Sequence, residues 1–312
     1  MPAFFLPQTL AGGIEVHTGL TYRQQEKRGV LLFLTPAIVV LLVTSVFPLL
    51  YSLVLSTFQW NMLMPLSVPK YTGLANFAKA FQDHEFTGSL LRTVLYVLIA
   101  VPAEFILGMA IAFLVTARLR GLPAFRVSLL MPLMMTPVVV GVLWRFLFNP
   151  EYGVVDFILQ ALGGHAVTWL AGRGTAFASI LIVEIWQQLP VVIFILAAGI
   201  SSLPDSIFEA ADIDGATRWQ RFRLLTLPLL RPVIAVVLLL RIMDCFKIFD
   251  ALYTLTYGGP GSSTELISLF IYKQGLKFFQ IGRATSMSWL FLLVVFVISI
   301  FFMRQVWKEQ SY

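Results

Sequence analysis

The sequence reads VLLFLTPAIVVLLVTSVFPLLYSLVLST over residues 30–57, and this run contains no charged side chain. An α-helix needs about 20 consecutive apolar residues to cross a hydrocarbon core of about 30 Å. The rest of the chain is also apolar, because 58% of its 312 residues are hydrophobic and only 12% are charged. Soluble domains carry roughly 25% charged residues. The sequence therefore predicts an integral membrane protein whose first spanning helix is this run.

Five further apolar stretches are long enough to cross a bilayer. Glu104 interrupts the second predicted span, Glu184 lies in the fourth, and the fifth carries four charges. The six predicted spans are 30–57, 93–117, 125–148, 177–200, 232–256 and 284–303. We therefore expect an all-α integral membrane protein with about six transmembrane helices, in which residues 30–304 form a single membrane domain.

Positive charges in the connecting segments predict the orientation, because cytoplasmic loops are enriched in Lys and Arg. One side of the predicted spans holds the larger basic set in the shorter segments: Arg23, Lys27, Arg28, Arg118, Arg120, Arg126, Arg218, Arg221, Arg223, Arg231, Arg304 and Lys308. We expect this side to be cytoplasmic, with the N-terminal segment 1–29, the loop 201–231 and the tail 305–312. These loops also account for the net charge of +6 without a nucleic-acid partner.

Several classes of chemistry lack their sequence signals. The chain has no Gly-x4-Gly-Lys-Ser/Thr loop, so we expect it not to bind ATP by that route. Its histidines, His17, His84 and His165, are scattered singly, and His84 fits a solvated loop better than a metal site. No nucleophile and base have a catalytic spacing. We therefore expect no metal, no cofactor and no enzymatic activity of the chain itself.

The loop 201–231 predicts two short helices joined by a turn. Pro204 suits a first helical position, and the acidic Asp205 and Glu209 favour the early turns of a helix. Gly215 predicts the end of this helix, because glycine accepts the left-handed conformation found there. A second helix is expected from about Thr217, ending before the fifth span at Leu227-Pro228. Such a pair can dock onto another protein or lie on the inner leaflet, and the residues alone leave both open.

This loop resembles a known motif. Glu209-Ala210-Ala211, then Gly215, then Leu225-x-Leu227-Pro228 resemble the EAA loop in permease subunits of binding-protein-dependent ABC importers, with Leu225 in place of isoleucine. Asp214-Gly215-Ala216 and Phe222 are similar to the carbohydrate branch, the maltose-type permeases. The segments 73–77 (GLANF) and 257–261 (YGGPG) are also similar to that branch.

The resemblance implies a multi-subunit importer in a bacterial or archaeal cytoplasmic (inner) membrane. Two homologous permease subunits form the pore, an ATPase dimer binds ATP and Mg, and an extracytoplasmic binding protein delivers a sugar or sugar-derived solute. Glu209 is expected to face a basic residue of the ATPase, and Gly215 to allow the bend between the helices. The coupling residues that the resemblance implies are Glu209, Ala210, Ala211, Asp214, Gly215, Ala216 and Phe222.

Charged residues within the predicted spans are costly, and they indicate function or pairing. Four alternate in sign at spacings of three in the fifth span: Arg241, Asp244, Lys247 and Asp250. Each can neighbour an opposite charge on the helix surface, so a purely structural ladder and contact with solute both remain open. We expect Glu104 to pair with a neighbouring helix, and Tyr253 and Tyr257 to anchor the interface.

The fourth span adds Glu184, Trp186 and Gln187 at a similar depth. Carboxylates and amides exchange hydrogen bonds with hydroxyl groups, and an aromatic face covers the apolar face of a sugar ring. The predicted substrate path is therefore Glu184, Trp186, Gln187, Asp244, Lys247 and Asp250. The alternative is an ion-coupled secondary transporter that uses the same charges. A membrane-embedded enzyme is a third class, but the expected residue clusters are missing.

Overall fold

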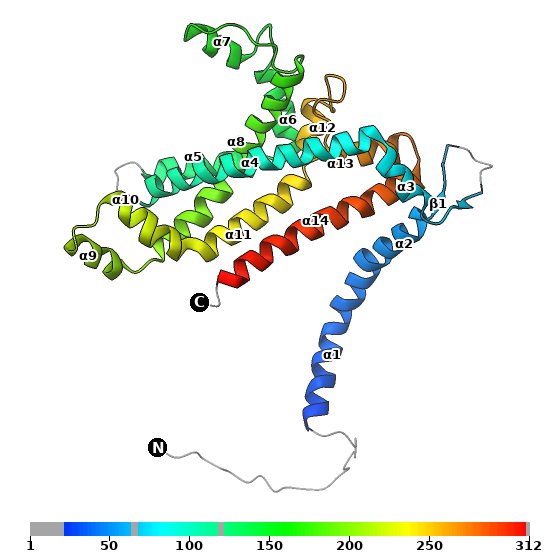
Figure 1. The fold of residues 1–312 in the computed structure, drawn as a ribbon, viewed down its shortest axis with the longest axis horizontal. Helices are drawn as coiled ribbons and strands as arrows, with labels where there is room; N and C mark the ends of the chain where they lie inside the picture. The colour runs from blue at the N-terminus through cyan, green and yellow to red at the C-terminus, as the bar shows by residue number, and fades with distance from the viewer. Residues whose placement is uncertain (1–21, 64–67, 118–121, 310–312) are drawn as a thin grey trace, which may run out of the picture. The chain divides into compact units, whose positions relative to one another are not determined.

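The computed structural model describes residues 22–63, 68–117 and 122–309. The chain divides into two compact units, residues 1–52 and 53–312, which are described separately. In chain order the helices and strands are α1 (Tyr22–Leu41), α2 (Phe47–Ser56), β1 (Phe58–Gln59), β2 (Lys70–Tyr71), α3 (Ala75–Gln82), α4 (His84–Thr116), α5 (Leu122–Met134), α6 (Pro137–Leu147), α7 (Val154–Ala161), α8 (Arg173–Ser201), α9 (Asp205–Ile213), α10 (Arg218–Arg221), α11 (Leu227–Phe246), α12 (Asp250–Leu255), α13 (Ile267–Tyr272) and α14 (Ile281–Glu309) (Figure 1). Within the described residues, π-helical turns join α1 to α2 at Leu42–Val46 and α10 to α11 at Phe222–Thr226, and another extends α13 at Lys273–Lys277.

The helical membrane architecture is confirmed. Within the described residues, five helices are long and apolar enough to span a membrane, or six if the bent pair α5–α6 counts as one span. The first of them, Val30–Ser56, has 27 residues. Its π-helical turn directly precedes Phe47-Pro48, and the Phe47 amide donates to the Leu42 carbonyl. Because Pro48 has no N–H to continue the α-helical pattern, a wider turn at this point is physically reasonable.

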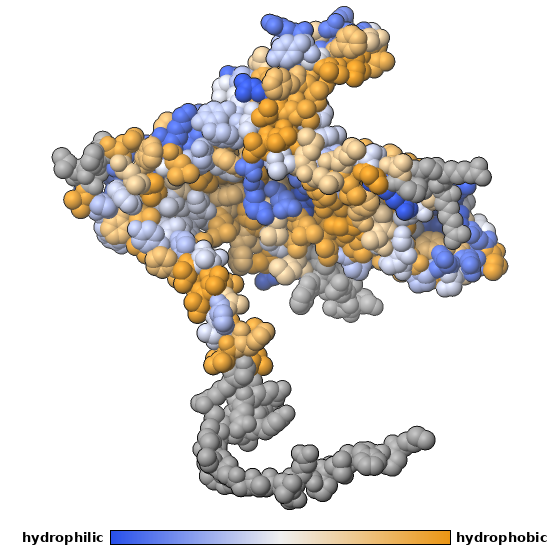
Figure 2. All heavy atoms as spheres, turned by 180° about the vertical axis from the view of Figure 1, so that it is seen from behind, coloured by the Kyte–Doolittle hydropathy of each residue, from blue (hydrophilic) through white to orange (hydrophobic). Residues whose placement is uncertain are grey.

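The second unit is built around α4, α8, α11 and α14. Helix α4 packs against α8 and α11, and α14 packs against α11 and α3. Apolar side chains from three of these helices, such as Tyr96, Ile180 and Ile242, share one buried core. Figure 2 shows that a hydrophilic patch also lies next to a broad apolar surface on one face.

The predicted third span, 125–148, is wrong as a single straight helix. It consists of α5 and α6, which are bent by 101° at the break between Met134 and Pro137. Thr136 is extended, with φ −68° and ψ 142°, and Pro137 begins the next helix. A residue before proline disfavours the helical region, whereas proline itself suits the first helical position. The sequence Thr136-Pro137 thus explains why the span breaks here.

The predicted fifth span, 232–256, is wrong as one continuous helix. It breaks after Phe246, and α12 follows as a separate short helix packed against α6. Ser268 donates a hydrogen bond to the Ile248 carbonyl in this break, so the carbonyl released from the helix is satisfied. At the other end the helix extends back to Arg218, through the π-helical turn Phe222–Thr226.

The elements that we expect outside the membrane are short. Strands β1 and β2 pair antiparallel, and the buried Asn76 at the start of α3 donates to the carbonyls of Ser56 and Phe58. Helix α4 begins nine residues before the predicted span start at residue 93, because Asp83 caps its first turn by accepting from the Glu85 amide. The orientation of the chain across the membrane stays a prediction.

Candidate functional site

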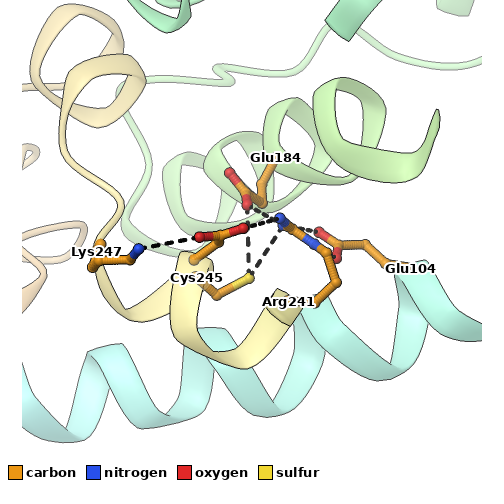
Figure 3. A network of polar contacts seen from close by, with 6 residues as sticks. Glu104, Glu184, Arg241, Cys245 and Lys247 are labelled. Carbon is orange, nitrogen blue, oxygen red and sulfur yellow. Dashed lines mark hydrogen bonds and ion pairs between the residues drawn. The ribbon is translucent and has the colours of Figure 1, made fainter. Parts of the chain in front are cut away.

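Arg241 lies at the centre of a buried ion-pair cluster that joins three helices (Figure 3). From α11, its Nε donates to Glu104 Oε2 of α4 at 2.7 Å, and one terminal nitrogen reaches Glu104 Oε1 at 3.1 Å. The same nitrogen donates to Glu184 Oε1 of α8 at 2.6 Å. The prediction that Glu104 pairs with a neighbouring helix is confirmed. Charge-assisted bonds of this kind fix the relative positions of the three helices.

Cys245 completes the inner side of this cluster. Its Sγ lies 3.6 Å from Glu184 Oε1 and 3.5 Å from Arg241. One ligand atom from each of Glu104, Glu184 and Cys245 lies within 4.8 Å of the others, a spacing that could hold a metal ion. The guanidinium of Arg241 already supplies positive charge to both carboxylates. The arrangement is therefore explained as an ion-pair cluster.

The outer side of the cluster is accessible. Asp244 Oδ2 lies 3.6 Å from Arg241, and Asp244 Oδ1 lies 3.2 Å from Lys247 Nζ. The Asp244 and Lys247 side chains are 53% and 65% exposed, in contrast to the buried Arg241. With the two glutamates, three carboxylates face two cations, so the cluster has a formal charge of −1. Asp244 and Lys247 can thus bind a polar ligand from the side where they are exposed. We call Glu104, Glu184, Arg241, Asp244, Cys245 and Lys247 the Arg241 cluster.

The predicted four-charge ladder is only partly present. Asp250 begins α12, beyond the helix break, and is exposed. No ion pair of Asp250 occurs among the described residues. Because the break ends the regular spacing of three, Asp250 does not continue the row that Arg241, Asp244 and Lys247 form.

The other predicted residues of α8 face the broken span. Gln187 is buried and donates from Nε2 to the Met135 carbonyl at 3.2 Å, which satisfies a backbone group at the break between α5 and α6. The Trp186 ring meets the Trp144 ring edge-to-face, with centroids 5.5 Å apart. Of the predicted substrate-path residues, the structure therefore brings Glu184, Asp244 and Lys247 together but places Trp186 and Gln187 against α5 and α6.

Beyond the helix break, Tyr253 and Tyr257 belong to a larger group of aromatic side chains. The sequence predicts these two tyrosines as interface anchors but not the group. Phe249, Tyr253, Tyr257 and Tyr272 form a chain of ring contacts with centroids 4.9–5.6 Å apart. Lys277 Nζ donates to the Tyr257 hydroxyl at 2.9 Å, and this hydrogen bond raises the pKa of Lys277. The spacing of Phe249, Tyr253 and Tyr257 at every fourth residue is the only sequence signal, since Tyr272 comes from another helix.

The loop 201–231 forms a helix, a glycine turn and a second helix, as its sequence predicts. Helix α9 ends at Ile213, and Gly215 adopts φ +73°, a conformation that favours glycine. Thr217 then starts α10 with a reciprocal capping box to Gln220. Arg221 of α10 forms an ion pair with Asp212 of α9, which closes the turn. Glu209 and Ala210 are exposed on α9, whereas Ala211 is buried.

The expected helix end at Leu227-Pro228 is wrong. Helix α10 continues through the π-helical turn into α11, and the Leu227 amide donates to the Phe222 carbonyl, five residues back. Pro228 directly follows this wider turn, and a π-helical turn is a place where a continuous helix can accommodate the missing N–H of proline. Phe222 packs against Phe113 of α4, with ring centroids 5.7 Å apart. The loop is thereby connected to α11 without a flexible link.

Comparisons with known proteins agree on one family. The family model described as "Binding-protein-dependent transport system inner membrane component" matches residues 72–306. A probable ABC transporter permease protein of Sinorhizobium fredii is 37% identical over 267 residues, which cover 86% of each chain. The trehalose/maltose transport system permease protein MalF of Thermococcus litoralis is 35% identical over 280 residues, covering 89% of this chain and 94% of the relative.

A solved structure has the same fold. A chain of a bacterial alginate ABC transporter, in complex with an alginate pentasaccharide-bound periplasmic protein, matches with a TM-score of 0.78. The match covers 90% of this chain and 95% of that chain, at 24% sequence identity.

Proposed function

This chain belongs to the family of inner-membrane components of binding-protein-dependent transport systems, and we propose that it lines the translocation path of an importer for sugars or sugar-derived solutes. The observation that carries the proposal is the match over 72–306, which contains both the Arg241 cluster and the loop 201–231. The sugar class is supported by the MalF relative, which is named as the permease protein of a trehalose/maltose transport system.

The proposed partners are a second homologous permease, an ABC ATPase dimer that holds ATP and Mg, and an extracytoplasmic binding protein. The proposed location is a bacterial or archaeal cytoplasmic membrane with both termini inside. An external binding protein is also supported by the solved alginate transporter, which is bound to its periplasmic protein. Loop 201–231, the coupling loop, would seat on the ATPase through the exposed side of α9, where Glu209 lies.

The coupling loop would transmit motion through a continuous helix. Arg218 and Arg241 lie on one uninterrupted helical segment, Arg218–Phe246. The 23 residues that separate them correspond to about 35 Å at about 1.5 Å per residue. A displacement of α10 by the ATPase would therefore reach the Arg241 cluster directly. This geometry supports alternating access to a binding site at membrane depth.

Solute contact is proposed for the exposed half of the Arg241 cluster. The Asp244 carboxylate accepts hydrogen bonds from hydroxyl groups, and the Lys247 ammonium donates them. Glu184 and Arg241 would hold these groups in place from below, since Arg241 contacts both Glu184 and Asp244. Trp186, Gln187 and Asp250 stay weaker candidates, because the first two pack on the broken span.

The test is reconstitution of the complete transporter in liposomes. Uptake of sugar should require external binding protein and internal ATP, and Glu209→Lys should abolish the coupled ATPase activity while membrane yield stays normal. Asp205→Lys, also exposed at the start of α9, is the matched control. If the chain alone transports sugar in response to an ion gradient, the secondary-transporter alternative replaces this proposal.

A further inference from the structure

A concave site that no residue of the Arg241 cluster lines is present in the second unit. It is a groove of about 680 Å³ between α4 and the coupling loop. One face of α4 forms its apolar wall, with side chains at spacings close to a helical turn: Phe105, Ile106, Met109, Ala110 and Phe113. Phe222 closes the inner end by packing on Phe113, and Arg218 and Arg221 stand at the loop side. Ile106 and Ala110 are exposed, so this part of the apolar wall is open.

The length of the groove corresponds to one leaflet of a bilayer. The apolar wall runs from Phe105 to Phe113, three residues before Thr116, the last residue of α4. This separation of eight residues is about 12 Å along the helix, most of one half of a hydrocarbon core of about 30 Å. An apolar wall of this length runs from the surface of the leaflet to near the midplane. A lipid acyl chain has the same dimension and polarity.

The charge at the groove's mouth selects the headgroup. Arg218 is exposed and has no carboxylate partner among the described residues, and Arg221 shares its charge with Asp212. Arginine binds phosphate through paired N–H groups, and basic pockets beside membrane helices at the cytoplasmic surface bind anionic lipid headgroups. The two guanidinium groups would lie at the depth of phosphates in the inner leaflet, if the coupling loop faces the cytoplasm as its basic residues predict.

We infer that this groove binds an anionic phospholipid, with one acyl chain along α4 and the phosphate on Arg218 and Arg221. The lipid bridges a membrane helix and the coupling loop. Its occupancy therefore stabilises α10 against α4. The site is separate from the proposed solute path, so its existence does not depend on the identity of the solute.

The experiment titrates the purified full-length chain with phosphatidylglycerol or with phosphatidylcholine and counts bound lipids by native mass spectrometry. Phosphatidylglycerol should bind more tightly. Arg218→Gln should weaken it about fivefold, since a basic residue near a lipid surface contributes about 1 kcal/mol, and should leave phosphatidylcholine unchanged. The matched control is Arg223→Gln, an exposed arginine of the same loop outside the groove. Ala110→Trp, which fills the apolar part, should weaken both lipids.

Three results would overturn the inference. The first is equal affinity for the two lipids, and the second is the same loss of phosphatidylglycerol binding in Arg218→Gln and Arg223→Gln. The third would come from a photoreactive residue in place of Ile106 in the complete transporter. Crosslinks to phospholipid support the inference, whereas crosslinks to another polypeptide would show that a protein segment fills the groove.

Discussion

Replacing Arg241 with methionine should destabilise the membrane bundle severely. The guanidinium makes three hydrogen bonds to carboxylates at 2.6–3.1 Å, and its partners Glu104 and Glu184 are buried. Methionine keeps a long apolar side chain but donates no hydrogen bond. The substitution therefore leaves two carboxylates in a buried environment without their cation.

Removal of one partner of a buried ion pair costs about 3–5 kcal/mol. At about 2–4 °C per kcal/mol for domains of a few hundred residues, the melting temperature should fall by roughly 6–20 °C. Glu104→Gln should cost less, because Arg241 keeps Glu184 and the formal charge of the cluster rises from −1 to 0. Combining Arg241→Met with Glu104→Gln and Glu184→Gln should recover part of the loss, because no buried charge then lacks a partner.

The assay is the temperature at which half of the detergent-solubilised chain loses its monodisperse gel-filtration peak. The control is Arg231→Met, an exposed arginine of the same helix. A melting temperature for Arg241→Met no lower than that of the control would refute the conclusion that this guanidinium holds α4, α8 and α11 together. No recovery in the triple variant would refute the part of the argument that depends on unpaired charge.

Three other substitutions test separate parts of the molecule. Gly215→Val should reduce coupled ATPase activity at least several-fold, because the backbone φ of +73° at this position is strained for a branched side chain. The control is Gly163→Val, at φ +85° outside the coupling loop, which should leave coupling unchanged. Asp244→Asn should raise the solute concentration needed for half-maximal uptake without lowering the membrane yield. The control is Glu151→Gln at an exposed position, and a loss of yield alone in Asp244→Asn would instead indicate a structural role. Gly141→Leu should lower the yield of folded chain, because a Cβ there would lie 1.9 Å from a side-chain oxygen of α12, and an undiminished yield would show that α6 and α12 can separate.

The long apolar helices could be predicted from the sequence because hydropathy over about 20 residues is a local property. The turn of the coupling loop was also predictable, since Gly215 determines it through its own backbone conformation. The breaks in the third and fifth spans could not be predicted in the same way. Thr136-Pro137 carried a usable signal, but hydropathy alone does not distinguish a straight span from a bent one. The break after Phe246 has no comparable signal, because the carbonyl that it frees is satisfied by Ser268, 20 residues away from Ile248.

The candidate site shows a similar limit. Spacing along the fifth span suggested partners three residues apart, and the pairs of Asp244 with Arg241 and with Lys247 follow that rule. The closest partners of Arg241, however, are 137 and 57 residues away in the chain, on α4 and α8. Only the packing of three helices brings those carboxylates together, so a single sequence can indicate that Glu104 and Glu184 need partners but not which partner they share.

These contacts constrain how the transporter can move. Because Arg241 pairs with both α4 and α8, sliding α11 past either helix would break a buried ion pair at a cost of about 3–5 kcal/mol. The three helices should therefore move as one body around the cluster. Displacement of the coupling loop is then carried to this body by the continuous segment Arg218–Phe246, and it can be absorbed beyond the cluster, at the break 247–249 where the helix ends. The π-helical turn of this segment lines the proposed lipid groove and the break begins at the exposed Lys247, so a ligand can bias the motion at either end of the segment.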